Sequence, residues 1–275
     1  MKRSDRLVGI TNYLIEHPME LVSLPSFSTM YNAAKSSISE DLTIVNNMFQ
    51  QEGIGYLESV AGAAGGVKYI PHLSREKCNE FLDQLCNRLE DSSRLLPGGY
   101  LFMSDLLGEP QTVRDIGRLF ATAFSDRDID VVVTVATKGI PLAYSVASFL
   151  NVPVVIVRRD PKVTEGSTVS INYVSGSSRK IQTMVLPKRS LPDGSKICII
   201  DDFMKAGGTI NGMVNLLKEF NAKVTAIGVL AEAEDEEEER VVEQDQYLSL
   251  VRIHNVDVKN NQIEVIKGNI LESME

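Results

Sequence analysis

The chain lacks any apolar run that approaches the roughly 20 residues a membrane-spanning helix needs. No apolar signal region follows the charged first six residues, so we do not expect secretion. Cysteines are few: Cys78, Cys86 and Cys198 are odd in number and match no metal spacing, which favours reduced thiols in the cytoplasm. The three histidines are too scattered to suggest a metal cluster or a catalytic dyad, and we assign no metal ligand and no catalytic residue.

Positive charge is also scarce, because 37 acidic residues outnumber 28 basic ones and the net charge is −9. Taken for the whole chain, this balance argues against nucleic acid as a partner. Much of the excess comes from the acidic run 234–239, which is typical of a solvated surface segment. The 275 residues and the hydrophobic content of 43% allow a substantial core and favour two domains.

Three helices and a hairpin are predicted before residue 74. Apolar residues recur at helical spacing over 4–17 and 26–31, and a third helix starts near Ser37, at a Ser-x-x-Glu capping box, and ends near residue 52. Strand-like segments at 54–60 and 67–70 flank a glycine-rich connection, which indicates a hairpin. This is the order of a winged helix-turn-helix domain, whose third helix enters the major groove of DNA.

Charge within this region is mixed, with five bases against seven acids, which is not the basic footprint of strong phosphate binding. The bases nevertheless gather near helix starts, where small hydroxyl side chains also reach phosphates and base edges. A small helical cap or dimerisation domain on an enzyme is the alternative. The predicted DNA-contacting residues are Lys2, Arg3, Arg6, Lys35, Ser36, Ser37, Ser39 and Lys68.

A helical segment over 74–96 with one apolar face links this region to the rest and is assigned structurally to the second domain. The predicted domains are therefore 1–73 and 74–275. In the second domain, a strand at 131–135, a loop, a helix at 141–150 and a strand at 152–157 form a βαβ unit. The predicted fold class is α/β, with a mainly parallel sheet flanked by helices.

Further segments of the second domain are predicted from the same patterns. The polar stretch 160–178 is typical of a functional lid or a disordered insert. Residues 247–258 and 262–266 alternate apolar and polar side chains, which predicts edge strands. The other expected elements are strands at 100–103, 181–186 and 223–230 and a helix at 112–124.

The most specific functional signal lies between Ile197 and Thr209. Four apolar residues predict a buried strand that ends at Asp201 and Asp202. Gly207 and Gly208 then form a turn where a ligand approaches the backbone, and Thr209 opens a helix. Because carboxylates accept hydrogen bonds from ribose hydroxyls, and turn amides with a helix dipole hold phosphate, this pattern predicts a sugar-phosphate site.

This run resembles the ribose-phosphate motif of type I phosphoribosyltransferases, which bind phosphoribosyl pyrophosphate (PRPP). The family has Ala and Thr where Lys205 and Ala206 stand here. The resemblance implies that the acids take the ribose hydroxyls and that 205–209 surrounds the 5′-phosphate. It places a pyrophosphate loop at 136–139 and a basic pair at Arg158 and Arg159, with Mg²⁺ accompanying PRPP. The candidate PRPP-binding residues are Tyr100, Thr137, Lys138, Gly139, Arg158, Arg159, Asp201, Asp202, Phe203, Lys205, Ala206, Gly207, Gly208 and Thr209.

The resemblance extends across the chain to the purine operon repressors of Gram-positive bacteria. It is carried by the segments 35–42, 62–71 and 201–209. It implies a homodimer that binds double-stranded operator DNA and is released by PRPP, with purine or guanosine tetraphosphate nucleotides as candidate competitors. The alternative is an active purine phosphoribosyltransferase with an accessory N-terminal domain, in which Tyr100 and Phe203 stack the base. An RNA-binding attenuator on the same fold has no support in the sequence.

Overall fold

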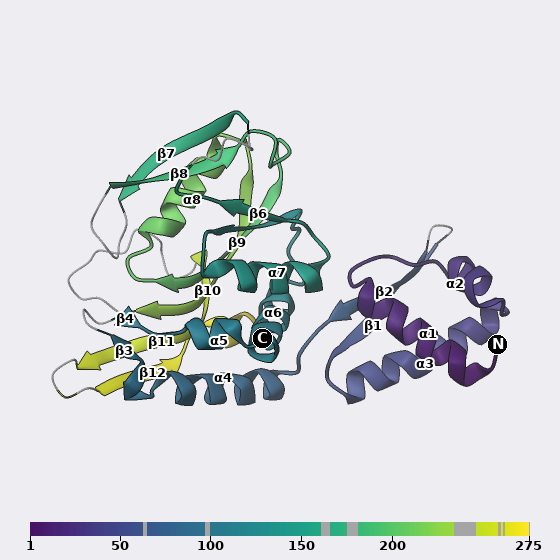
Figure 1. Cartoon of the computed structure of the whole chain (residues 1–275). Coiled ribbons are helices and arrows are strands. Elements are labelled where there is room, and N and C mark those ends of the chain that lie inside the picture. The colour runs from purple at the N-terminus through teal and green to yellow at the C-terminus, as the bar shows by residue number, and fades with distance from the viewer. Residues whose placement is uncertain are drawn as a thin grey trace.

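The structure is a computed structural model of the chain (Figure 1). It describes residues 1–62, 65–96, 100–160, 166–174, 181–233, 246–257, 260 and 262–274, with only the backbone of Tyr100. Within these ranges, no helix has the length and apolar character that crossing a membrane requires. The elements gather into a small N-terminal unit and a larger α/β unit, joined where β2 leads into α4 (Figure 1).

The N-terminal unit contains the predicted three helices and hairpin. Its own apolar core includes Ile10, Leu14, Phe27, Ile38 and Phe49, all buried. The hairpin strands pair antiparallel, and a bridge between Val22 and Val67 ties the segment before the second helix to them. Its elements are α1 (Arg3–Glu16), α2 (Leu24–Tyr31), α3 (Lys35–Gln51), β1 (Gly55–Val60) and β2 (Gly66–Pro71).

Two predicted helix starts in this unit are wrong by about a turn or less. Helix α3 begins at Lys35, and its N-cap residue Ala34 makes no side-chain cap, so the Ser37–Glu40 pair lies inside the first turns. Helix α2 begins at Leu24 because Ser23 caps it, with its Oγ accepting from the Ser26 amide at 3.2 Å. In both cases the helix was predicted correctly and only its start was misplaced; for α2 the upstream cap Ser23 sets the boundary.

The larger unit is built on a six-stranded sheet in the order β12-β11-β10-β9-β5-β6. All neighbouring pairs are parallel except β11 with β12, which confirms the mainly parallel α/β fold. The sheet strands are β5 (Val131–Val135), β6 (Val154–Val157), β9 (Lys196–Met204), β10 (Lys223–Ala233), β11 (Leu248–Asp257) and β12 (Gln262–Lys267). The other elements are α4 (Arg75–Leu89), η1 (Ser92–Arg94), β3 (Leu95–Leu96), β4 (Tyr100–Leu101), α5 (Ser104–Gly108), α6 (Pro110–Ala123), α7 (Gly139–Leu150), β7 (Thr168–Val174), β8 (Ile181–Pro187), α8 (Gly208–Lys218) and η4 (Ile270–Met274).

Helices and a hairpin cover the two faces of this sheet. Val132, Cys198 and Ile200 point into the core formed with α4, α5, α6 and α7. The alternate residues Val133 and Ile199 point into the core formed with α8 and the β7–β8 hairpin. The period-two alternation explains why these strands read as continuous apolar runs, because both faces are buried.

Four expectations for the larger unit need correction. Residues 168–174, inside the predicted lid, form β7, which pairs along its whole length with β8. Strand β9 continues past the acidic pair to Met204, since β10 pairs with it that far. Strand β11 is internal, covered by β10 on one side and β12 on the other. The short elements α5 and β3 were not predicted, and 161–165, 175–180 and the acidic run 234–239 lie outside the described residues.

The junction between the units is a small packed contact. The predicted linker helix is α4, which ends at Leu89 and not at residue 96, where β3 ends. Its buried face of Cys78, Leu82 and Leu85 packs against β11, β12 and η4. Just before it, the Leu73 amide donates to Thr122 Oγ1 of α6 at 3.0 Å, in a buried position. Helix α6 also lies against β2, so the hairpin of the small unit touches a helix of the larger one.

Candidate functional site

A crevice forms at the carboxyl ends of β5 and β9. From β5 the chain crosses to β6 on one side, whereas from β9 it continues to β10 and β11 on the other. Neighbouring parallel strands whose connections diverge in this way leave a crevice at their carboxyl ends, where open α/β sheets bind ligands. The loop after β5 and the turn after β9, predicted separately from sequence, therefore meet at one place.

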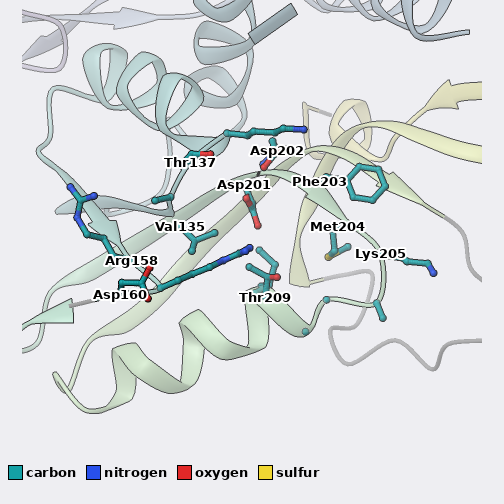
Figure 2. A pocket seen from close by; sticks show the side chains of 17 residues that line it. Val135, Thr137, Arg158, Asp160, Asp201, Asp202, Phe203, Met204, Lys205 and Thr209 are labelled. Carbon is teal, nitrogen blue, oxygen red and sulfur yellow. Dashed lines mark hydrogen bonds between the residues drawn. The ribbon is translucent and has the colours of Figure 1, made fainter. Parts of the chain in front are cut away.

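This crevice holds a cavity of about 530 Å³, of the size that takes a small charged ligand. Figure 2 shows Asp201 and Asp202 at its centre, with Thr209 facing them from the start of α8. The cavity is lined by Val135, Ala136, Thr137, Lys138, Arg158, Arg159, Asp160, Asp201, Asp202, Phe203, Met204, Lys205, Ala206, Gly207, Gly208, Thr209 and Ile210.

The acidic pair is held in an environment that does not favour its charge. Asp201 is 3% exposed, and its Oδ1 accepts from the Asp202 amide at 3.0 Å. Burial, followed by the neighbouring charge of Asp202, raises the pKa of Asp201 well above its usual range. Burial also raises the pKa of Asp202, which the charges of Lys138 and Arg159 partly offset. Two carboxylates kept close at such a cost are typical of a functional site that a ligand completes.

The turn after the pair leaves backbone amides available. Gly207 is the N-cap residue of α8 and has a φ of 80°. This is a left-handed conformation that glycine adopts without strain and that residues with a side chain disfavour. Because glycine has no side-chain oxygen, no side-chain cap forms at this helix start within the described residues, and its first amides can bind an anion at the cavity. A helix start of this kind beside an acidic pair suits a ligand that has hydroxyls at one end and phosphate at another.

The loop after β5 brings positive charge to the opposite side of the cavity. Thr137 and Lys138 are exposed and line it, and the Ala136–Thr137 peptide bond is cis. Gly139 is buried behind them as the first residue of α7. A Cβ there would lie 2.3 Å from Thr134 Oγ1, so only glycine allows the loop to approach β5 this closely.

The predicted ligand residues fall into three groups. The loop residues, Asp201 to Thr209 and the two arginines line the cavity, although Figure 2 shows Arg158 and Lys205 extending away from the acidic pair. Gly139 lies beneath the cavity, and the side chain of Tyr100 is outside the described residues. Sequence reasoning placed Ala136 in the pyrophosphate loop and missed the lining residues Val135, Asp160, Met204 and Ile210, although each adjoins or lies within a predicted segment.

The predicted DNA-contacting residues are also divided. Lys35, Ser36 and Ser39 are exposed at the start of α3. Arg3 and Arg6 instead hold the buried carboxylate of Asp41, through Nε–Oδ distances of 2.9 and 2.5 Å, and so tie α1 to α3. The remaining predicted residues are Lys2, which is exposed, Ser37, which is half-buried, and Lys68, which pairs with Glu58 at 2.8 Å on the hairpin.

A groove of about 540 Å³ runs between α3 and the hairpin. Lys35, Ser39 and Thr43 line one wall, and hairpin residues including Ser59 and Gly62 line the other. Thr43 was not predicted, although it follows Ser39 by one helical turn and shares its face. The groove brings the start of the third helix and the hairpin to a common surface, as a winged helix requires.

Together these features define a phosphoribosyltransferase fold joined to an N-terminal winged helix-turn-helix domain. Residues 2–71 match the family profile for the N-terminal domain of the bacterial purine repressor, and residues 103–265 match the phosphoribosyl transferase domain profile. The chain belongs to the bacterial purine repressor family.

Relatives of this chain support both halves of the assignment. It is 60% identical to the purine biosynthesis transcriptional repressor of Bacillus subtilis, over 98% of this chain and 94% of that one. It is 45% identical to the purine biosynthesis transcriptional activator of Lactococcus lactis, over 98% of both chains. Among solved structures, the adenine phosphoribosyltransferase of Giardia lamblia, complexed with 9-deazaadenine, matches with a TM-score of 0.51 and 26% identity, covering 57% of this chain and 89% of that one.

Proposed function

We propose that the protein is a transcriptional repressor of purine biosynthesis genes that binds operator DNA and is released by PRPP. One observation carries the proposal: an acidic pair and an uncapped helix start share one cavity in a chain that also has a winged helix. The near full-length similarity to a purine repressor supports the choice of genes. The relative from Lactococcus lactis is an activator, so a reporter assay with the gene deleted must fix the sign of the regulation.

DNA binds, in this proposal, across the groove between α3 and the hairpin. Lys35, Ser36 and Ser39 contact phosphates and base edges in the major groove, while Lys68 reaches the flanking backbone. Arg3 and Arg6 are each engaged by Asp41, so their contribution to DNA is to hold α1 against α3 and to add positive charge. A unit with more acids than bases binds weakly alone, and two copies on one operator raise its avidity.

The homodimer is part of the proposal. Between α1 and α3, on the side away from Lys35 and Ser39, lies an uncharged groove of about 470 Å³ lined by apolar side chains that include Ile44 and Met48. Val8 in the same groove is 70% exposed, and exposed apolar patches commonly mark association surfaces. We also propose the boundary between residues 73 and 74, supported by the separate core of the N-terminal unit. Sedimentation of the full chain measures the oligomer.

PRPP fits the cavity by its chemistry. The ribose hydroxyls donate to Asp201 and Asp202, and the 5′-phosphate accepts from the turn at 205–209 and the first amides of α8. The pyrophosphate would lie against Thr137, Lys138 and Arg159, where Mg²⁺ accompanying PRPP would help to neutralise its charge. Without PRPP the two carboxylates repel each other. Ligand hydroxyls and cations relieve that repulsion, which favours binding.

Release of DNA is then a consequence of linkage. If PRPP binds the DNA-free form more tightly than the DNA-bound form by a factor α, PRPP weakens operator binding by the same factor, with couplings of about 1–3 kcal/mol being typical. The test is a fluorescence-anisotropy titration of operator DNA with and without PRPP and Mg²⁺. Operator affinity that ignores PRPP would sink the inducer role. Changing Asp201 and Asp202 to Ala should abolish the response and spare DNA binding.

A residual phosphoribosyltransferase activity is the second candidate, favoured by the fold itself and by the similarity to the Giardia lamblia enzyme. Phe203 lines the cavity and is the described aromatic side chain that could stack a purine there. Incubation with PRPP, Mg²⁺ and each purine base, followed by measurement of pyrophosphate release, separates an enzyme from an effector-binding protein.

A further inference from the structure

Asn46 ties the third helix of the N-terminal unit to the first strand of the hairpin. It lies in α3, and its Oδ1 accepts a hydrogen bond from the Leu57 amide of β1 at 2.7 Å. Within the described residues β1 pairs with β2 alone, so the amides along its other edge need partners from outside the hairpin. Asn46 supplies such a partner and thereby fixes the hairpin against α3.

The same hydrogen bond decides which end of the Asn46 carboxamide faces outward. A backbone amide only donates, so its partner is the carboxamide oxygen, and Nδ2 lies at the other end. Asn46 is half-buried and lines the groove between α3 and the hairpin. In the part of the chain that the structure describes, Nδ2 makes no hydrogen bond and is not buried, so its N–H groups are open to the groove.

A carboxamide held in this way offers the groove hydrogen-bond donors. Asparagine recognises adenine in the major groove with both ends of its carboxamide, one accepting and one donating. Because the Leu57 amide holds Oδ1 at the hairpin, the two ends of Asn46 cannot both face one base. Donors alone suit an oxygen of the DNA backbone, since a phosphate only accepts.

The place of Asn46 along α3 agrees with a backbone contact. Recognition helices meet base edges with their N-terminal residues, and Lys35 and Ser39 line the groove at that end of α3. Asn46 follows Lys35 by eleven residues, which is about 16 Å along the helix axis. The major groove is only about 12 Å wide. With the start of α3 at the bases, Asn46 therefore reaches the backbone that borders the groove.

We propose that Asn46 donates from Nδ2 to a phosphate oxygen of the operator while its Oδ1 holds the hairpin. One side chain then makes a DNA contact and sets the place of the hairpin relative to that contact. The role assigned to Asn46 rests on the proposed binding of DNA across the groove between α3 and the hairpin.

Asn46→Asp separates the DNA contact from the support of the hairpin. The aspartate keeps an oxygen for the Leu57 amide, but it removes the donor and places a negative charge against the phosphate. Asn47→Asp is the matched control, because it adds the same charge at an exposed position of α3 outside the residues that line the groove. Fluorescence anisotropy of the full-length protein without PRPP measures both variants. The probes are a duplex from upstream of a purine biosynthesis gene and a duplex of equal length and unrelated sequence.

We expect Asn46→Asp to bind both duplexes at least about tenfold more weakly than Asn47→Asp does, because one hydrogen bond to a charged group is worth this much. The factor should be the same for the two duplexes, since a phosphate contact carries no sequence information. The affinity for PRPP and the thermal midpoint should stay close to those of Asn47→Asp, because the hydrogen bond to the hairpin is kept.

Two results would overturn the proposal. Equal DNA affinities of Asn46→Asp and Asn47→Asp would mean that Asn46 only supports the hairpin. A loss confined to the purine-gene duplex would mean that Asn46 contacts a base. If Asn46→Asp does not fold, the same assay on Asn46→Ala and Asn47→Ala decides the matter, and equal affinities there overturn the proposal as well. A native protein that does not prefer the purine-gene duplex rejects the proposed function instead, so the two failures are distinguishable.

Discussion

Asp41 and Asp201 are buried carboxylates in the two halves of the molecule, and their surroundings shift their pKa values in opposite directions. In the N-terminal unit Asp41 is 0% exposed and is held by Arg3 and Arg6, and their hydrogen bonds outweigh the effect of burial and lower its pKa. In the larger unit Asp201 is nearly as buried, but its nearest charged neighbour is Asp202, and its pKa is raised. A carboxylate that is satisfied within the chain holds the fold together. One that is not is kept for a ligand.

The largest effect on stability is expected from removing the charge of Asp41, which Arg3 and Arg6 hold. Asp41→Asn removes the buried counter-charge of Arg6, whose side chain is mostly buried, and of the half-exposed Arg3. Removing one partner of a buried ion pair should cost about 2–4 kcal/mol of unfolding free energy. Urea denaturation followed by circular dichroism measures it, with loss of operator binding as α1 separates from α3. The matched control is Glu40→Gln, an exposed neighbour that touches only Arg3, at 3.3 Å. A loss below about 0.5 kcal/mol there is expected of an exposed pair, and equal losses in the two variants would contradict the special role of Asp41.

Removing the charge of Asp201 should change the stability of the ligand-free protein in the opposite direction. Asp201→Asn removes a buried charge that the chain does not compensate, so the ligand-free protein should gain roughly 1–2 kcal/mol at neutral pH while PRPP binding is lost. Thermal unfolding with and without PRPP measures both quantities. Asp160→Asn, at an exposed carboxylate of the same cavity, is the control and should leave the stability unchanged. Destabilisation by Asp201→Asn would mean that Asp201 is structural, like Asp41.

The contributions of the two carboxylates to stability should also depend differently on pH. The pKa of Asp201 is raised in the folded state, so its stability cost is present at neutral pH and disappears as pH falls through that raised pKa. The pKa of Asp41 is lowered, so its contribution persists to about pH 4 and is lost only below that. As pH falls from neutral, the gain in Asp201→Asn should therefore shrink, while the loss in Asp41→Asn stays nearly constant down to about pH 4. A gain in Asp201→Asn that is independent of pH would contradict this assignment.

The sequence shows one of these carboxylates far better than the other. Asp201 ends an apolar run beside a second acid and a glycine turn, so a local pattern announces both the strand and the site. Asp41 reads as an ordinary helix residue, because its partners Arg3 and Arg6 lie 38 and 35 positions away and meet it only when α1 packs on α3. Contacts of that range depend on tertiary packing, which no local pattern encodes. For the same reason both arginines were predicted only as DNA contacts.

The strands also differ in how well a local sequence pattern predicts them. Strands buried on both faces, such as β5, are continuous β-branched runs and could be read from the sequence with their boundaries. Strand β7 could not, because its exposed face carries Ser170 and Asn172, and its strand character comes from full-length pairing with β8. The meeting of loop 136–139 with Asp201 follows from strand order, which sequence suggests only by resemblance.

The smallest effect is expected where the two units touch. The Leu73 amide donates to Thr122 Oγ1 at 3.0 Å in a buried position, and Thr122 belongs to α6, which packs on α7, the helix that begins at the loop lining the cavity. Thr122→Val removes that acceptor and should cost about 1 kcal/mol of stability. If this contact carries the influence of PRPP to the winged helix, the variant should still bind operator DNA and PRPP separately, while the fold-change that PRPP causes in operator affinity decreases. Ser125→Ala is the control, because Ser125 lies just past the end of α6 and its Oγ donates to the Thr122 carbonyl within the larger unit. An undiminished response in Thr122→Val would assign the coupling to another route, such as direct competition between PRPP and DNA phosphates for the positive charge around Lys138 and Arg159.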